Sequence, residues 1–392
     1  MLDDVFNEMV NSGEKSKHDE ENNDLIEWNH IMIHKGLNHG SLVAPAEMTN
    51  LDLEIKVAKA ETIGSRSYME DRTYTSVREA GSLEGGCCPL SLSCVFDGHN
   101  GKYVSEMLQA KFASTFATLF RAAEMRVDFR DANYTAHVVS IFEEASMLID
   151  AEILRADYIR QQHTIKTGIQ DIQSFAGSAA VMMAVLPVVH NDLHYQQSMK
   201  FSSPRVRSSM YQEQMQNKVQ VFVAHVGDCR AVLCNDGVAV QLTIDHKPSC
   251  KTEKARIEAA GGSVHNGRVN GLGVSRAFGD IQFKVFSEAP GFVNGQENLH
   301  SLWNTNQPVI SKPEIKHFIV ESPFEFVILA CDGLWDVFDC QEAVNFVRKR
   351  LAVTRNVDKT AQELIQKALK RGTQDNTSVV IVTFHQTEMA LM

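Results

Sequence analysis

The stretch Ser93-Cys94-Val95-Phe96-Asp97-Gly98-His99-Asn100-Gly101 decides the fold, because it joins a short apolar run to a carboxylate and a tight turn. Short apolar runs bounded by turn residues are typical of buried β-strands. A carboxylate at the mouth of a buried strand is costly unless it is paired or bound to a metal ion. The stretch therefore predicts a buried strand that ends at a polar site.

The same pattern recurs at four further aspartates, which lie beside apolar runs or tight turns: Asp71, Asp228, Asp332 and Asp375. Asp228 follows the run Val221–Gly227, and Asp332 follows Phe326–Cys331. When several strands end in carboxylates, the economical interpretation is one shared cation site. Ligands that are all oxygen atoms select hard ions such as Mg²⁺ or Mn²⁺ over zinc.

Six ordered motifs contain these aspartates: Gly64-Ser65-Arg66 to Met69-Glu70-Asp71; Val95–His99; Gly177–Ala180; His225–Ala231 with Asp245–Pro248; Val274–Asp280; and Ala330–Asp336 with Asp375-Asn376. In this order they resemble the metal-dependent type 2C (PPM) family of serine/threonine protein phosphatases. A single Asp-Gly-His triplet would be a common turn. Six motifs spread over residues 55 to 385 make a specific resemblance that covers most of the chain.

The chain departs from the family pattern at three motif positions. Ala179 stands where the family usually has threonine, and Cys229 and Cys331 stand where it usually has serine. None of these is a ligand position in the family. The departures therefore concern local packing and not the metal site.

The resemblance implies a two-cation site with named ligands. Asp97 would bridge the two ions, and Gly98 would offer its carbonyl oxygen. Asp332 and Asp375 would complete the coordination of one ion. Two cations about 3.5–4 Å apart supply hydroxide near neutral pH and neutralise charge on phosphoryl oxygens.

Arg66 and His99 are the candidate catalytic residues. A guanidinium matches phosphate bidentately, so we expect Arg66 to bind phosphate, although a surface salt bridge is the alternative. The leaving serine or threonine alkoxide needs a proton, and His99 could act as the general acid. The alternative is that His99 is a turn residue without a chemical role.

Four more carboxylates are weaker candidates. The resemblance implies that Glu70 and Asp71 hold metal-bound waters, where the alternative is a solvated turn pair. It also implies that Asp228, together with Asp332, helps to hold a third, loosely bound cation, and Asp336 is a weaker candidate for the same role. The alternative for Asp228 is an ordinary hairpin carboxylate.

The order of the expected elements indicates an α+β fold. Strand runs come first, followed by helices near 102–125 and 136–161, more strands, two further helices with caps expected at Asp339 and Asp358, and a last strand. The turn Asn235-Asp236-Gly237 predicts a hairpin and hence antiparallel pairing. One stacking that covers both sheets is a four-layer αββα sandwich of two antiparallel β-sheets flanked by helices, and the resemblance implies the same architecture.

The chain divides into a tail and one large domain. Residues 1–50 form an N-terminal tail that we expect to be partly disordered, and residues 51–392 form a single PPM-type catalytic domain. The polar stretch 190–218 is interpreted as an insertion, since structureless loops of that length are uncommon inside compact domains. A second insertion is expected near 285–310, within a region, 263–312, that resembles a loop.

Composition limits the partners and the location. The net charge of 38 − 49 = −11 argues against a nucleic-acid footprint, and no apolar run is long enough to span a bilayer. The eight cysteines lack metal-site spacing, and no signal peptide or lipid-anchor motif is found. We therefore expect an intracellular protein, cytoplasmic or nuclear or both, and we expect it to be a monomer without a membrane anchor.

The function that these observations favour is a metal-dependent protein phosphatase. It would hydrolyse phosphoserine and phosphothreonine in proteins by attack of metal-activated water, with two Mg²⁺ or Mn²⁺ ions tightly bound and a third weakly bound. One alternative is a catalytically weak or inactive regulatory binding module of the same fold. Another is a hydrolase of small phosphorylated molecules. A binding module could dispense with its metal ligands, yet Asp97, Asp332 and Asp375 are all present.

Overall fold

The computed structural model describes residues 53–77, 89–124, 134–168, 175–187, 219–284, 292–293, 296–297, 307–320 and 325–386. They belong to one compact unit, Thr49–Met392. The expected tail and the 190–218 insertion lie outside the described residues, as does most of the expected 285–310 insertion. These three predictions therefore stay predictions.

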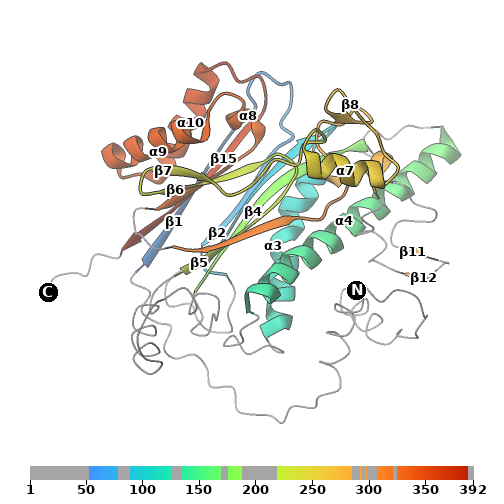
Figure 1. Cartoon of the computed structure of the whole chain (residues 1–392), viewed down its shortest axis with the longest axis horizontal. Coiled ribbons are helices and arrows are strands. Elements are labelled where there is room, and N and C mark those ends of the chain that lie inside the picture. The colour runs from blue at the N-terminus through green and yellow to red at the C-terminus, as the bar shows by residue number, and fades with distance from the viewer. Residues whose placement is uncertain are drawn as a thin grey trace, which may run out of the picture. The chain divides into compact units, whose positions relative to one another are not determined.

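Two large antiparallel sheets form the centre of this unit (Figure 1). The first contains, in spatial order, β1 (Leu53–Thr62), β15 (Thr377–Gln386), β14 (Phe326–Ala330), β6 (Arg230–Asn235) and β7 (Val238–Gln241). The second contains β13 (Glu314–Ile319), β5 (Val219–Val226), β4 (Gly177–Pro187), β3 (Ser91–His99) and β2 (Arg72–Val77), with β10 (Phe278–Gly279) paired to one end of β4. The antiparallel α+β arrangement confirms the predicted fold class.

Helices cover the outer face of each sheet, as Figure 1 shows. The second sheet is covered by α3 (Tyr103–Glu124) and α4 (Tyr134–Thr167). The first sheet is covered by α8 (Asp332–Trp335), α9 (Cys340–Thr354) and α10 (Val357–Lys370). The remaining elements are α7 (Lys251–Ala259), β8 (Val264–His265), β9 (Arg268–Val269), a 3-10 turn (Ile281–Phe283), β11 (Phe292–Val293) and β12 (Gln296–Glu297).

The central strands bury both faces, which explains why most of their residues are apolar. In β4, Ala180 and Met182 pack against the helices, while Val181 and Met183 pack into the layer between the sheets. In β14, alternate side chains likewise pack against the covering helices or into the same layer between the sheets. Because successive side chains in a strand point to opposite faces, each strand contributes to two of the three apolar layers.

This alternation also determines where the first aspartates lie. Val95 faces the layer between the sheets, so Asp97, two residues later in β3, lies on the same face. Cys331 belongs to that layer too, and Asp332 follows it directly as the first residue of α8. The sequence thus places both carboxylates at one end of the core between the sheets.

The start of α9 follows its predicted local signal, and three other features differ from the prediction. The side chain of Asp339 accepts a hydrogen bond from the backbone N–H of Glu342 at 2.7 Å, as part of a full capping box at the start of α9. Helix α10 begins after Asn356, whose side chain caps Lys359, although we expected the cap at Asp358. The four-residue helix α8 was not predicted, and the expected loop 263–312 contains short strands.

A cluster of phenylalanines joins α3 to α4, and its centre should dominate the stability of this layer. Phe116 is fully buried, and its ring centroid lies 4.6 Å from that of Phe142 on α4. We expect Phe116→Ala to lower the free energy of unfolding by about 3–5 kcal/mol, because it leaves a cavity. Urea denaturation followed by circular dichroism measures this loss. Val353→Ala, at a side chain that is 69% exposed on α9, is the control and should change stability by less than about 0.5 kcal/mol.

Candidate active site

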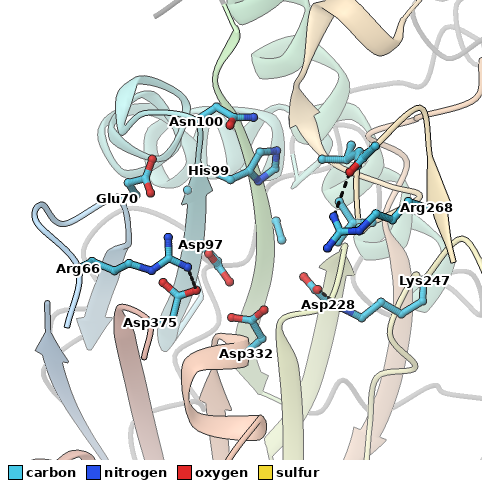
Figure 2. A pocket seen from close by; sticks show the side chains of 16 residues that line it. Arg66, Glu70, Asp97, His99, Asn100, Asp228, Lys247, Arg268, Asp332 and Asp375 are labelled. Atoms are coloured by element: carbon cyan, nitrogen blue, oxygen red, sulfur yellow. Dashed lines mark hydrogen bonds and ion pairs between the residues drawn. The ribbon is translucent and has the colours of Figure 1, made fainter. Parts of the chain in front are cut away.

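A pocket of about 400 Å³ lies at the end of the layer between the sheets (Figure 2). Its walls include the 66–70 loop, the end of β3, the turn around Gly271, the segments that follow β5 and β14, and the segment before β15. The lining residues used below are Arg66, Glu70, Asp97, Gly98, His99, Asp228, Lys247, Arg268, Asp332 and Asp375. Eight of the ten predicted site residues therefore meet in one cavity.

Three carboxylates converge at the bottom of this pocket. One oxygen from each of Asp97, Asp228 and Asp332 lies within 4.8 Å of the others, and Figure 2 shows the three groups pointing toward a common centre. Burial raises the pKa of Asp97 well above its usual value, and the nearby charges, that of Asp332 first, raise it further. Repulsion of this kind is relieved when a cation binds between the carboxylates.

Asp332 and Asp71 share this electrostatic strain. Burial and the neighbouring Asp228 raise the pKa of Asp332 to about 7. Burial also raises the pKa of Asp71 to about 6. Asp71 is 2% exposed and, among the described residues, its Oδ2 atom has no hydrogen-bond partner. Buried carboxylates held this close form a site suited to a divalent cation.

The donor set fits the hard ions that the sequence predicts. The converging atoms of Asp97, Asp228 and Asp332 are all carboxylate oxygens. Gly98 allows the close approach of the 66–70 loop, because a Cβ atom there would lie 2.4 Å from the backbone oxygen of Glu70. The residues present therefore fit divalent cations with oxygen coordination.

Asp375 and Arg66 form an ion pair at the rim. Nη2 of Arg66 donates to Oδ2 of Asp375 at 2.5 Å, and both side chains are partly exposed. The next residue, Asn376, is buried, accepts a hydrogen bond from the backbone N–H of Glu70 at 2.7 Å and donates to the backbone oxygen of Ile63. Asn376 thus connects the segment before β15 to the loop that carries Arg66.

Glu70 and Asp336 differ in how they relate to the pocket. Glu70 lines it, and its Oε1 atom accepts a hydrogen bond from the backbone N–H of Gly101 at 2.5 Å. Asp336 is exposed and is not part of the lining. Burial and the charge of Asp228 nevertheless raise the pKa of Asp336, against the opposing effect of Lys247. Of the weaker candidates, Asp71 and Asp336 are therefore the two outside the lining, although an oxygen of Asp71 lies within 4.8 Å of one of Asp97.

Lys247 occupies the space beside Asp228. Its ammonium group forms an ion pair with Oδ2 of Asp228. Burial works against the charged form of Lys247, but Asp228 outweighs it, and the pKa of Lys247 lies above its usual value. A third cation at Asp228 would therefore have to share this carboxylate with the lysine.

His99 is bonded to an aspartate that sequence reasoning missed. Its Nε2 atom lies 2.7 Å from Oδ2 of Asp280, which is fully buried. Burial alone would lower the pKa of His99, but the Asp280 carboxylate outweighs it, and the pKa lies above 6.5. Asp280 is the last residue of the motif Val274–Asp280, and the motif alone did not indicate a role for it. Its position directly after Phe278-Gly279, at the end of a short strand, was the signal that could have found it.

Lys247 and Arg268 also line the pocket, and spacing alone did not reveal them. Arg268 lies on the hairpin β8–β9, and its Nη1 atom donates to the backbone oxygen of Gly271 at 2.9 Å (Figure 2). His225 and His246 are buried and stacked with a ring-centroid distance of 4.3 Å.

Comparison with known proteins points to the same type of enzyme as the acidic pocket does. The sequence profile of protein phosphatase 2C matches residues 200–377, which include Asp228, Asp332 and Asp375. "Probable protein phosphatase 2C 57" of Oryza sativa subsp. japonica is 30% identical over 329 residues, or 82% of this chain and 71% of that protein. The chain belongs to the protein phosphatase 2C family.

Other relatives agree with this membership. "Protein phosphatase 1B" of Mus musculus is 32% identical over 324 residues, which cover 82% of this chain and 68% of the mouse protein. A crystal structure of a phosphatase from Toxoplasma gondii superposes with a TM-score of 0.58 at 23% identity, covering 86% of this chain and 97% of that one, and supports the fold. The chain is accordingly a metal-dependent serine/threonine protein phosphatase that acts on phosphoproteins, as the sequence predicted. None of these matches favours the alternative of an inactive binding module.

The raised carboxylate pKa values predict that the stability of the metal-free protein falls as the pH rises. An acid whose pKa is higher in the folded state binds more protons when folded, so stability falls as pH rises from the unfolded pKa of about 3.9 to the folded one. For Asp332 the folded value is about 7. In EDTA, Asp332→Asn should therefore melt at a higher temperature than the wild type, and the difference should grow from pH 5 to pH 8.

Scanning calorimetry at several pH values measures this difference. Mn²⁺ should reverse it, because the ion stabilises the wild type by binding only the folded state. If the difference in melting temperature stays constant across this pH range in EDTA, the pKa of Asp332 is not raised in the folded protein.

Proposed function

We propose that this pocket hydrolyses phosphoserine and phosphothreonine with two Mg²⁺ or Mn²⁺ ions held by Asp97, Asp332, Asp375 and the carbonyl of Gly98. The convergence of Asp97, Asp228 and Asp332 within 4.8 Å carries this proposal, because a bound divalent cation relieves the repulsion among buried carboxylates so close together. When bound, such ions make a hydroxide nucleophile available near neutral pH and neutralise charge on the phosphate.

The protein groups around the ions have separate tasks. Arg66 binds the phosphoryl oxygens, since its pair with Asp375 uses only one nitrogen of a guanidinium that has five N–H donors. As water attacks phosphorus, the bond to the serine or threonine oxygen breaks, and His99 gives its proton to that oxygen. The carboxylate of Asp280 favours the protonated form of His99 that this step needs.

Glu70 and Asp71 surround the ions without being assigned as direct ligands. Glu70 is tied to the turn after β3 by its hydrogen bond from Gly101, and Asp71 keeps one buried oxygen without a partner among the described residues. We propose that both accept hydrogen bonds from water molecules that complete the coordination of the ions.

The direct test is dephosphorylation of a phosphothreonine peptide. Phosphate release should require Mn²⁺ or Mg²⁺, should stop in EDTA and should return when excess Mn²⁺ is added. A small aryl phosphate serves as the second substrate, because it reports on the site without depending on peptide contacts. Equal phosphate release with and without EDTA would contradict the proposal.

The ligand assignment predicts the effect of nearly isosteric changes. We expect Asp97→Asn, Asp332→Asn and Asp375→Asn each to lower turnover at least ~100-fold, since changes in groups that merely support metal ligands already cost ~10–100-fold. Steady-state assays in saturating Mn²⁺ measure this, with circular dichroism as the check on folding. Asp358→Asn, at an exposed position on α10, is the control. Near-normal turnover in one variant would remove that residue from the ligand set.

The general-acid role predicts a dependence on the leaving group. We expect His99→Gln to slow hydrolysis of a phosphothreonine peptide by ~100-fold or more, because an alkoxide needs protonation. Hydrolysis of para-nitrophenyl phosphate should fall much less, because its phenolate leaves readily without a proton. Turnover numbers on both substrates give the ratio, and equal losses would rule out proton donation by His99.

Asp228 is proposed to hold a third, weakly bound cation. We expect Asp228→Ala to reduce turnover and to raise the Mn²⁺ concentration needed for activity, while two ions stay tightly bound. An ion with so few protein ligands keeps most of its waters and binds weakly. Activation curves and equilibrium dialysis with Mn²⁺ measure both quantities. If the wild type and the variant have superimposable activation curves, Asp228 is a structural partner of Lys247 only.

The proposal also covers the cellular location and the oligomeric state of the protein. We propose an intracellular protein, cytoplasmic or nuclear or both, which acts as a monomer. Its net charge of −11 supports the further proposal that it does not bind nucleic acid. None of the described helices is long and apolar enough to cross a bilayer. We propose that the surfaces around the pocket determine which phosphoproteins are substrates.

A further inference from the structure

The partner of His99 lies two strands away from it in the sheet. His99 ends β3, where it stands opposite Gly177 of β4, and Gly177 in turn stands opposite Gly279 of β10. Asp280 follows Gly279 directly. Neighbouring strands are about 4.8 Å apart, so β3 and β10 are separated by about 9.6 Å. Side chains from these two strands can meet only by reaching across the strand between them.

Gly177 makes this meeting possible. A Cβ atom at Gly177 would lie 2.3 Å from Nε2 of His99 and 2.3 Å from Oδ2 of Asp280. Any side chain at this position would therefore enter the space that the 2.7 Å contact between His99 and Asp280 occupies. The absence of a side chain at Gly177 is what allows the pair to form.

The backbone around Asp280 is held in a conformation that aims its side chain at His99. Asp280 has φ 53° and ψ 42°, in the left-handed region that asparagine and aspartate tolerate better than most residues. Its N–H donates to the backbone oxygen of Ala176 at 3.0 Å, and the preceding N–H, of Gly279, donates to Oδ1 of Asp150 at 2.7 Å. These bonds fix the turn on β4 and α4 independently of His99.

We propose that Asp280 is the positioning residue of His99: it accepts the Nε2–H of the imidazole across Gly177 and thereby leaves Nδ1 to face the leaving oxygen of the substrate. A carboxylate is an acceptor, so the shared hydrogen resides on Nε2. Among the described residues, this is the one hydrogen bond found for the His99 ring. Asp280 itself is fully buried and does not line the pocket, so it acts only through His99.

The inference rests on the proposed role of His99 as the proton donor and adds the group that orients it. The role requires one ring nitrogen to be directed at the substrate, and an imidazole on the end of a strand can rotate about two side-chain bonds. A hydrogen bond of 2.7 Å to a buried carboxylate on a fixed turn removes that freedom. Preorganisation of this kind is worth several kcal/mol in other enzymes that use an aspartate to orient a histidine.

Two variants break the pair without changing His99. Asp280→Asn removes the carboxylate at a position whose left-handed backbone asparagine tolerates, and Gly177→Ala places a methyl group between the partners. For each variant, the measured quantity is turnover on a phosphothreonine peptide divided by turnover on para-nitrophenyl phosphate. We expect this ratio to fall by about tenfold or more relative to the wild type, since general acid catalysis contributes ~10²–10⁴-fold.

The ratio separates positioning from simple loss of structure. Both substrates meet the same folded molecules, so a partly unfolded preparation lowers both rates and leaves the ratio unchanged. Asp157→Asn is the matched control, because Asp157 is another fully buried aspartate, paired with Arg160 on α4, and among the described residues it has no hydrogen bond to His99 or to the turn that carries Asp280. Its ratio should equal that of the wild type, whatever its stability.

A double variant completes the test. In the His99→Gln background, Asp280→Asn should cause no further fall in the ratio, since the group that it orients is already gone. An unchanged ratio in both Asp280→Asn and Gly177→Ala, when His99→Gln alone lowers it, would overturn the positioning role and leave the proposed function standing. If His99→Gln itself leaves the ratio unchanged, the proton-donor role fails and the inference fails with it.

Discussion

Mutual repulsion among buried carboxylates at one end of the core between the sheets is the constraint on which the rest of the site depends. Asp97 and Asp332 are placed there by strands whose alternate side chains fill the apolar layer between the sheets. Burial and the neighbouring charges raise the pKa of both groups. A protein that only needed stability would be better served by apolar side chains at these positions, so the carboxylates indicate a bound cation.

The surroundings of the carboxylates are arranged so that both sheets contribute. Asp97 comes from the sheet covered by α3 and α4, whereas Asp332 and Asp375 come from the sheet covered by α9 and α10. Asn376 connects the two sides through its hydrogen bonds to the loop that carries Arg66. The pocket therefore exists only when the two sheets are packed on each other, which couples metal binding to the stability of the whole domain.

Most of the fold and the bottom of the pocket could be predicted because they follow from apolar runs. The strands that end at or just before Asp97 and Asp332 are buried on both faces, and such strands are rich in apolar residues. Short or irregular elements gave no comparable signal. Helix α8 has only four residues. At the start of α10, two polar residues, Asn356 and Asp358, could each have served as the N-cap. The side chain of Asn356 makes the capping bond, so the expectation at Asp358 was wrong.

The residues that surround the metal site were harder to predict, because they depend on contacts between distant segments. Asp280 reaches His99 only because Gly177 lies between them, and their sequence separation is 181 residues. Lys247 pairs with Asp228 across a loop, and Arg268 enters the pocket on a short hairpin. None of these relations has a spacing that local sequence rules describe.

The most direct measurement is anomalous X-ray scattering from crystals soaked in Mn²⁺. The account predicts two strong Mn²⁺ peaks about 3.5–4 Å apart, as in two-metal hydrolases, on either side of the Asp97 carboxylate. One of the two should also contact Asp332 and Asp375. Absence of a peak at Asp97 under conditions that support phosphatase activity, or a peak confined to another part of the molecule, would contradict the central claim.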